Sequence, residues 1–244
     1  NLAVKIFEET IDEKQYNRLV NQYDIDDITY SYENLKATLY MGAFFHDIGK
    51  LDSEFQNWVN NSDDDKLLLD ESDNSEKLKN KSDDFKIKVR HNEISFLIIE
   101  NLFDDFDSLN DFLSNFTTFQ FNKSLKKDSL KNIVNYLIYW HHDKYFRTEQ
   151  LNTYKSIYDA IYSNTRIKQI INNVRNYTNI NDFSIDEDKQ KNTPYFKFWT
   201  NEECLVNTNS QNIYLNLTNE KSKRQIFIEA IKTLLRSILI TSDV

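Results

Sequence analysis

Glycine and proline are almost absent from this chain. Only two glycines and one proline occur in 244 residues. Sandwiches and barrels need many tight turns, and tight turns rely on these two residue types. The shortage therefore argues against an all-β architecture and favours a mostly helical protein.

Cysteine is equally scarce, since Cys204 is the only one. A single thiol can form no intrachain disulfide and cannot build a cysteine-based zinc site.

No apolar run approaches the roughly 18 residues of a membrane span, and the N-terminus carries no signal-peptide pattern. We therefore expect a soluble, cytoplasmic protein with no membrane partner. The chain starts at Asn1 without a methionine, and both ends resemble cut points, so a longer natural protein is expected.

The charge balance is acidic, with a formal net charge of -9. This argues against indiscriminate binding of nucleic acid, because contacts to phosphate supply the main electrostatic contribution there. It does not exclude a nuclease. Charge acts locally, and a carboxylate-rich site becomes positive once metal ions fill it.

Apolar residues recur at helical spacing along much of the sequence, and these stretches predict helices. The expected helices cover 33–46, 53–60 with Phe55 and Trp58 facing inward, 91–104, 128–142, one or two helices within 148–177, and 220–241.

The remaining segments modify this helical pattern only slightly. Residues 194–199 and 213–217 alternate or run apolar, which predicts a short pair of strands. Residues 61–86 are acidic and low in complexity, which predicts a mobile surface insertion and not a domain boundary. We expect one all-α domain over 1–244, with minor β decoration.

All the histidines lie at the ends of apolar helical stretches. His46 precedes Asp47, His91 follows Arg90, and His141 and His142 are adjacent. A single histidine at a helix end is more often a cap or a core residue than a ligand. Here every histidine of the chain has that setting, which favours a shared metal site.

The chemistry of these residue types explains why a fold would gather them. Neutral imidazoles and carboxylates suit Mn, Fe, Ni, Zn or Mg. The two oxygens of one aspartate can bridge two cations, and paired metals activate a water and stabilise the leaving oxygen of a phosphodiester. Lys50 lies one helical turn beyond His46, at a position from which it can offset charge on a phosphate.

Competing motifs are missing. Gly49 and Lys50 do not form a P-loop, because Gly42 has the wrong spacing and Leu51 replaces the hydroxyl residue. A dinucleotide fingerprint needs three glycines, and no Gly-x-Ser-x-Gly elbow is present. We therefore expect no ATP hydrolysis by this chain alone.

Several strings of the sequence resemble one known family. HDIGKLDSEFQ at 46–56, RHNEIS at 90–95 and HHD at 141–143 are similar to the HD nuclease domain of the CRISPR-associated helicase-nuclease of type I systems. That family belongs to the HD phosphohydrolase superfamily, whose signature is the His-Asp tandem. The terminal LLRSILITSDV resembles the closing helix of the family, which ends in a ligand aspartate, here Asp243.

The resemblance implies an α-helical HD fold that binds one or two divalent ions, such as Mn, Fe, Ni or Mg. It implies cleavage of single-stranded DNA, or of RNA, after a crRNA-guided surveillance complex has opened the target. The helicase, fused or separate, must lie elsewhere, since this chain lacks a Walker motif.

The resemblance also implies roles for individual residues. His46, Asp47 and Asp243 would hold the first metal. Asp47 would bridge to a second metal that His91, His141 and His142 complete, and Lys50 would face the scissile phosphate. Asp47 and Lys50 are thus the expected catalytic residues. The family usually has a further histidine on an early helix, which this chain lacks, so the first metal would be held more weakly.

Two alternatives stay open. The His-Asp tandem also occurs in HD phosphohydrolases that act on nucleotides, and the missing early histidine is compatible with a non-catalytic HD-like scaffold.

Weaker candidates for binding nucleic acid are two basic clusters, whose alternative interpretation is a solvated helix face. They are Lys123, Lys126, Lys127 and Lys131, and Lys221, Lys223 and Arg224. Tyr139, Trp140 and Tyr145 have both stacking on bases and core packing as possible roles.

Overall fold

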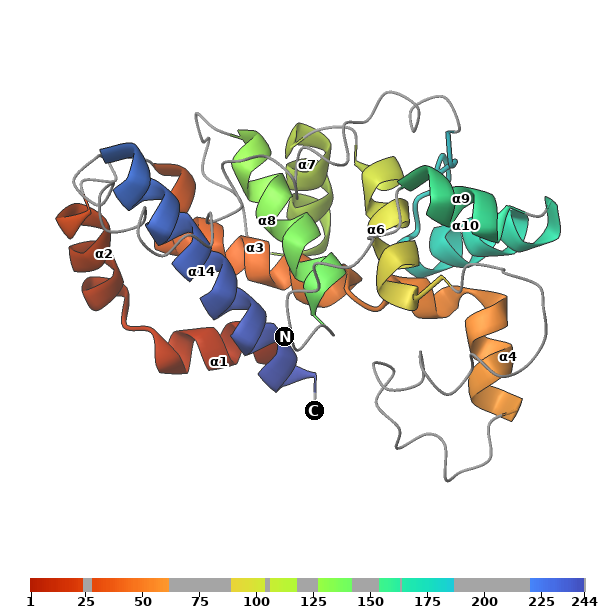
Figure 1. The fold of residues 1–244 in the computed structure, drawn as a ribbon, viewed down its shortest axis with the longest axis horizontal. Coiled ribbons are helices and arrows are strands. Elements are labelled where there is room, and N and C mark those ends of the chain that lie inside the picture. Colours follow the sequence, from red (N-terminus) through yellow and green to blue (C-terminus); the bar gives the residue numbers. More distant parts are fainter. Residues whose placement is uncertain are drawn as a thin grey trace, which may run out of the picture. The chain divides into compact units, whose positions relative to one another are not determined.

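Every regular element in the described part of the chain is a helix (Figure 1). The structure is a computed structural model. It describes residues 1–23, 28–61, 89–103, 106–117, 127–141, 154–162, 164–186 and 220–243. Contacts between residues divide the chain into two compact units, and each is described by itself.

The first unit is built around helix α3 (Tyr32–Phe45), which packs against α1, α2, α8 and α14. Leu35, Leu39 and Phe45 of α3 are fully buried. The other elements of this unit are α1 (Leu2–Thr10), α2 (Glu13–Gln22), the short 3-10 helix η1 (Ile28–Tyr30), α7 (Phe106–Phe116), α8 (Lys127–Trp140) and α14 (Glu220–Ser242).

Helices α3 and α8 touch close to their C-terminal ends. A Cβ atom added to Gly42 would lie 2.8 Å from Cδ1 of Leu137, and both residues lie within one turn of the last residue of their helix. Beside this contact, Phe45 packs against Phe103 and Phe112, with ring centroids 5.6 and 5.2 Å away. The first unit therefore holds the ends of α3 and α8 together.

The second unit surrounds the short 3-10 helix η2 (Ile48–Leu51), which directly follows the His-Asp tandem. Helix η2 packs against α6, α4 and α10. The helices of this unit are α4 (Ser53–Asn61), α6 (His91–Leu102), α9 (Tyr154–Ile161) and α10 (Asn164–Thr178). Helix α6 starts with a capping interaction, because the backbone N–H of Arg90 donates to the carboxylate of Glu93 at 2.9 Å.

Helix α10 binds the segment just beyond η2 through charged and amide side chains. Arg166 donates to both oxygens of Asp52, from Nε at 3.0 Å and from a terminal nitrogen at 2.7 Å. Asn173 donates to the carbonyl of Leu51 at 2.8 Å. Asp52 is 1% exposed, so this pair is a buried, bidentate ion pair. Within this unit η2 is fixed by α10 as well as by α6.

The predicted helices are confirmed, and their ends shift by a few residues. The interval 148–177 contains two helices, α9 and α10. Among the α-helices that the structure describes, α1, α2 and α7 were not predicted. The first two have clear capping residues, since Asn1 accepts from the N–H of Ala3 at 3.0 Å and Asp12 accepts from Gln15 at 2.9 Å.

Other expectations fall outside the described residues. The strands predicted at 194–199 and 213–217 lie there, as does nearly all of the insertion predicted at 61–86. The single-domain assignment stays a prediction. Among the helices that the structure describes, none is long and apolar enough to cross a membrane.

Candidate metal centre

The His-Asp tandem lies on a tight turn that the chain presses against helix α6. Helix α3 ends at Phe45, His46 and Asp47 follow, and η2 begins at the next residue. A Cβ atom added to Gly49 would lie 1.9 Å from the carbonyl oxygen of His91 and 2.9 Å from the backbone nitrogen of Ser95. Both atoms are backbone and cannot rotate away. Glycine at this position is therefore required by the close approach of the turn to α6.

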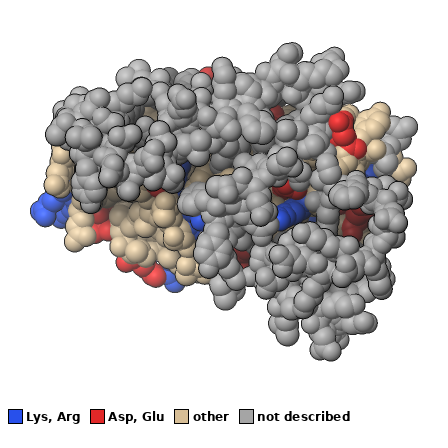
Figure 2. Space-filling model, viewed as in Figure 1, with Lys and Arg blue, Asp and Glu red and all other residues tan. Residues whose placement is uncertain are grey.

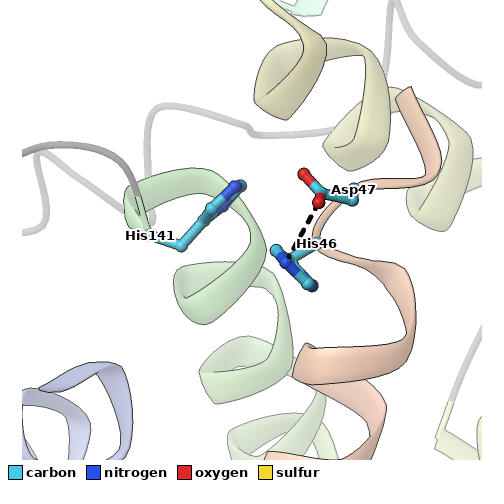
Figure 3. A group of neighbouring side chains, drawn as sticks. All are labelled: His46, Asp47 and His141. Carbon is cyan, nitrogen blue, oxygen red and sulfur yellow. Dashed lines mark ion pairs between the residues drawn. The ribbon is translucent and has the colours of Figure 1, made fainter. Parts of the chain in front are cut away.

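Asp47 is surrounded by basic side chains from its own turn and from α6. His46 Nε2 lies 3.3 Å from Oδ2 of Asp47, and His91 Nε2 lies 3.3 Å from Oδ1. Lys50 Nζ lies 2.8 Å from Oδ2. Each oxygen of the carboxylate thus has one imidazole beside it, and Figure 3 shows the pair that His46 makes.

His91 is fixed by its surroundings. Its side chain is 1% exposed, and its ring packs edge-on against Phe55, with the centroids 5.3 Å apart. This contact confirms the inward orientation expected for Phe55. The side chain of Trp58, which was expected to face the same way, lies outside the described part of the chain.

These residues fit a divalent cation. Imidazole nitrogens and carboxylate oxygens bind such metals at about 2.1 Å, so neighbouring ligands of one ion lie about 3.0–3.4 Å apart. The two N–O separations of 3.3 Å fall in that range. The donor set of nitrogen and oxygen, with no sulfur, suits Mn, Fe, Ni, Zn or Mg.

His141 belongs to the first unit and directly follows the last residue of α8. It is buried, and its Nδ1 lies 2.7 Å from the carbonyl oxygen of Ile138. A carbonyl can only accept, so Nδ1 carries the proton, and Nε2 of the neutral ring carries the lone pair that a metal needs. Arg236 of α14 donates to the carbonyl of Trp140 at 2.7 Å and so fixes this end of α8.

Two predicted ligands have less structural support. His142 lies outside the described residues. Asp243 is exposed at the end of α14, and its backbone N–H donates to Ile240 at 3.3 Å. The structure thus brings His46, Asp47, Lys50 and His91 close together, while metal binding and catalysis by all the predicted site residues stay predictions.

The basic clusters can be followed only in part. Lys131 donates to the backbone carbonyl of Phe103 at 2.8 Å. Its ammonium group therefore binds a backbone oxygen within the protein. The remaining members lie outside the described residues, wholly or in their side chains; they are Lys123, Lys126, Lys127, Lys221, Lys223 and Arg224. On the face drawn in Figure 2, the described Lys and Arg residues form small separate groups near acidic ones.

Tyr139 and Trp140 are both 3% exposed, which makes them core residues and not a stacking surface. Tyr145 lies outside the described residues.

The sequence did not reveal the residues that hold this turn in place. Ser95 was part of the RHNEIS string, but nothing in the string assigned it a role. Asp52 and Arg166 pair across 114 positions of the sequence, and no local pattern signals a contact of that range.

The family described as Cas3, HD domain matches residues 3–206, well over half of the chain. The matched part contains all the histidines and Asp47, while Asp243 lies beyond it. No curated protein and no solved structure matches the chain.

Proposed function

This chain belongs to the Cas3 HD-domain family, a nuclease domain of CRISPR interference, and from that premise we propose that it cleaves single-stranded DNA with divalent metal ions. The observation that supports this most is the Asp47 carboxylate, which has His46 beside one oxygen and His91 beside the other. A nuclease that uses paired metals needs a carboxylate able to serve both.

The two proposed ligand sets would share Asp47. His46, Asp47 and Asp243 hold the first ion. Asp47, His91, His141 and His142 hold the second. His46, Asp47 and His141, drawn in Figure 3, carry nitrogen and oxygen donors of the kind that divalent metals bind. The ends of α3 and α8 meet in the first unit, and these helices directly precede His46 and His141.

In the proposed reaction, Asp47 and the histidines position the metal ions, while Lys50 acts on the phosphate. Bound divalent ions lower the pKa of a water and offset charge on the leaving oxygen of a phosphodiester. Asp47 and the imidazoles orient that site, because the turn and helix α6 fix their positions. Lys50, whose Nζ lies beside Asp47, provides a positive charge to the phosphate of the bound strand. The native ion is Mn, Fe, Ni or Mg.

Substrate delivery depends on other polypeptides or domains. The chain has no Walker motif, so strand opening needs a helicase, fused or separate. A crRNA-guided surveillance complex exposes the target strand. The net charge of -9 fits a domain that receives its strand from partners and does not collect nucleic acid by general attraction.

A substrate panel tests this proposal. Purified chain is incubated with end-labelled single-stranded DNA, duplex DNA, single-stranded RNA and nucleotides, each with Mn²⁺, Fe²⁺, Ni²⁺ or Mg²⁺. We expect fragments from single-stranded DNA that require metal and disappear with EDTA. Hydrolysis of nucleotides without cutting of polymers would establish a nucleotide phosphohydrolase instead. Metal binding without hydrolysis of any substrate would indicate a scaffold.

A further inference from the structure

The hydroxyl of Ser95 joins both ends of the turn that carries the His-Asp tandem. Its oxygen accepts the backbone N–H of Gly49 at 2.8 Å and donates to the backbone carbonyl of His46, also at 2.8 Å. A hydroxyl has one hydrogen and two lone pairs, so it can make both bonds at once. Ser95 is 0% exposed, so its hydroxyl is shielded from solvent.

The position of Ser95 on α6 gives these bonds a consequence for the ligands. His91 lies one turn earlier on the same helix, so the two side chains lie on one face. The turn also contacts the backbone of His91, because a Cβ atom added to Gly49 would lie 1.9 Å from the carbonyl oxygen of His91. Ser95 therefore fixes the turn that bears His46 and Asp47 onto the helix that bears His91.

From this geometry we propose that Ser95 is a positioning residue for the metal ligands, an inference that rests on the proposed function. It touches neither metal nor substrate. It sets the distance between Asp47 and His91, and through the carbonyl of His46 it sets the orientation of the first imidazole. Loss of the hydroxyl frees the turn to move relative to α6, so the ligand atoms no longer converge.

Affinity for Mn²⁺ separates this role from general stabilisation. Free and bound Mn²⁺ are counted by electron paramagnetic resonance in wild type, Ser95→Ala and Thr178→Val, all below their melting temperatures. Thr178 is a matched control, because it is 0% exposed in the same unit and its hydroxyl also bonds twice, to Val174 and Ile180. Loss of groups that orient ligands weakens metal binding about tenfold or more.

We expect Ser95→Ala to bind Mn²⁺ about tenfold more weakly and Thr178→Val to bind like wild type. Cleavage by Ser95→Ala should recover as Mn²⁺ is raised. Equal affinity in Ser95→Ala and Thr178→Val would overturn the proposal. If Ser95→Ala does not fold, Ser95→Cys has a side chain of similar shape but a much weaker donor and acceptor, so it should bind Mn²⁺ more weakly than wild type. A folded Ser95→Cys variant with wild-type affinity would also overturn the proposal.

The same experiment separates two kinds of failure. Wild-type chain that binds no Mn²⁺ and cuts no DNA contradicts the proposed function itself. Wild-type chain that does both, with Ser95→Ala unchanged, contradicts only the role of Ser95.

Discussion

Replacing Gly49 with alanine should be among the most damaging single-methyl changes in this protein. The new Cβ would lie 1.9 Å from the carbonyl oxygen of His91, whereas non-bonded heavy atoms prefer about 3.5–4.0 Å. The turn and α6 must separate by more than 1 Å, roughly, which also breaks both bonds of Ser95. Overpacking costs about 1–3 kcal/mol, and each lost hydrogen bond costs about 1 kcal/mol.

The expected loss for Gly49→Ala is therefore about 4 kcal/mol in the free energy of unfolding. For a chain of this size that lowers the melting temperature by about 10 °C. Thermal and urea unfolding followed by circular dichroism measure both quantities. We also expect Mn²⁺ affinity to fall, because the turn moves away from His91.

The only other glycine provides the control. A Cβ on Gly42 meets Cδ1 of Leu137 at 2.8 Å and Cβ of Leu137 at 3.1 Å, so the Leu137 side chain must rotate and α8 must shift by a few tenths of an ångström. Alanine offsets part of this cost because it improves helix propensity by about 1 kcal/mol. Gly42→Ala should therefore cost no more than about 2 kcal/mol, which is less than the loss expected for Gly49→Ala. The reasoning is refuted if Gly49→Ala is no less stable than Gly42→Ala.

Three further predictions follow from other contacts. Arg166→Met leaves the buried Asp52 carboxylate without its cationic partner and should cost about 3 kcal/mol in urea unfolding. A smaller loss than that of Glu54→Gln, which removes an exposed partner of Arg166, would contradict this. Burial raises the pKa of Tyr16 above its usual value near 10, so its neutral form stabilises the fold fully below that pH and the contribution is lost as pH rises further. Tyr16→Phe should flatten the fall in urea midpoint between about pH 9 and 11, and an unchanged slope would argue against this. Lys50→Met should slow cleavage about a hundredfold while Mn²⁺ binds no more weakly, because an ammonium beside Asp47 opposes the cation; weaker Mn²⁺ binding would contradict that role.

Much of the fold was predictable because its signals are local. The shortage of Gly and Pro and the apolar spacing of α3, α6, α8 and α14 identified long helices correctly. Helices α1 and α2 were missed although Asn1 and Asp12 cap them. Helix α1 does carry apolar residues at helical spacing, namely Ala3, Val4 and Phe7, whereas α2 buries only Tyr16 and its sequence gives little apolar signal. A capping residue before a short segment is only a weak indication of a helix, because a helix this short is stabilised mainly by packing, here against α3.

For the candidate site, the sequence identified the residues that carry the chemistry but not the contacts that position them. The His46-Asp47 tandem and the RHNEIS string identified residues that lie together in the structure. What fixes them could not be read from the sequence, since the bonds of Ser95 and the pair between Arg166 and Asp52 depend on how distant segments pack. A contact that depends on a single hydroxyl or a single ion pair produces no recurring pattern in the amino-acid sequence, so it cannot be predicted from spacing.

We propose that Asp47 holds the metal ions with which this chain cleaves single-stranded DNA. The most direct test compares wild type, Asp47→Asn and Asp159→Asn for Mn²⁺ bound and for cleavage of labelled single-stranded DNA. Asp159 is an exposed carboxylate of α9, which makes it a control for charge alone. We predict that Asp47→Asn stays folded but loses Mn²⁺ binding and cleavage, while Asp159→Asn keeps both. Wild-type cleavage by Asp47→Asn would contradict the account.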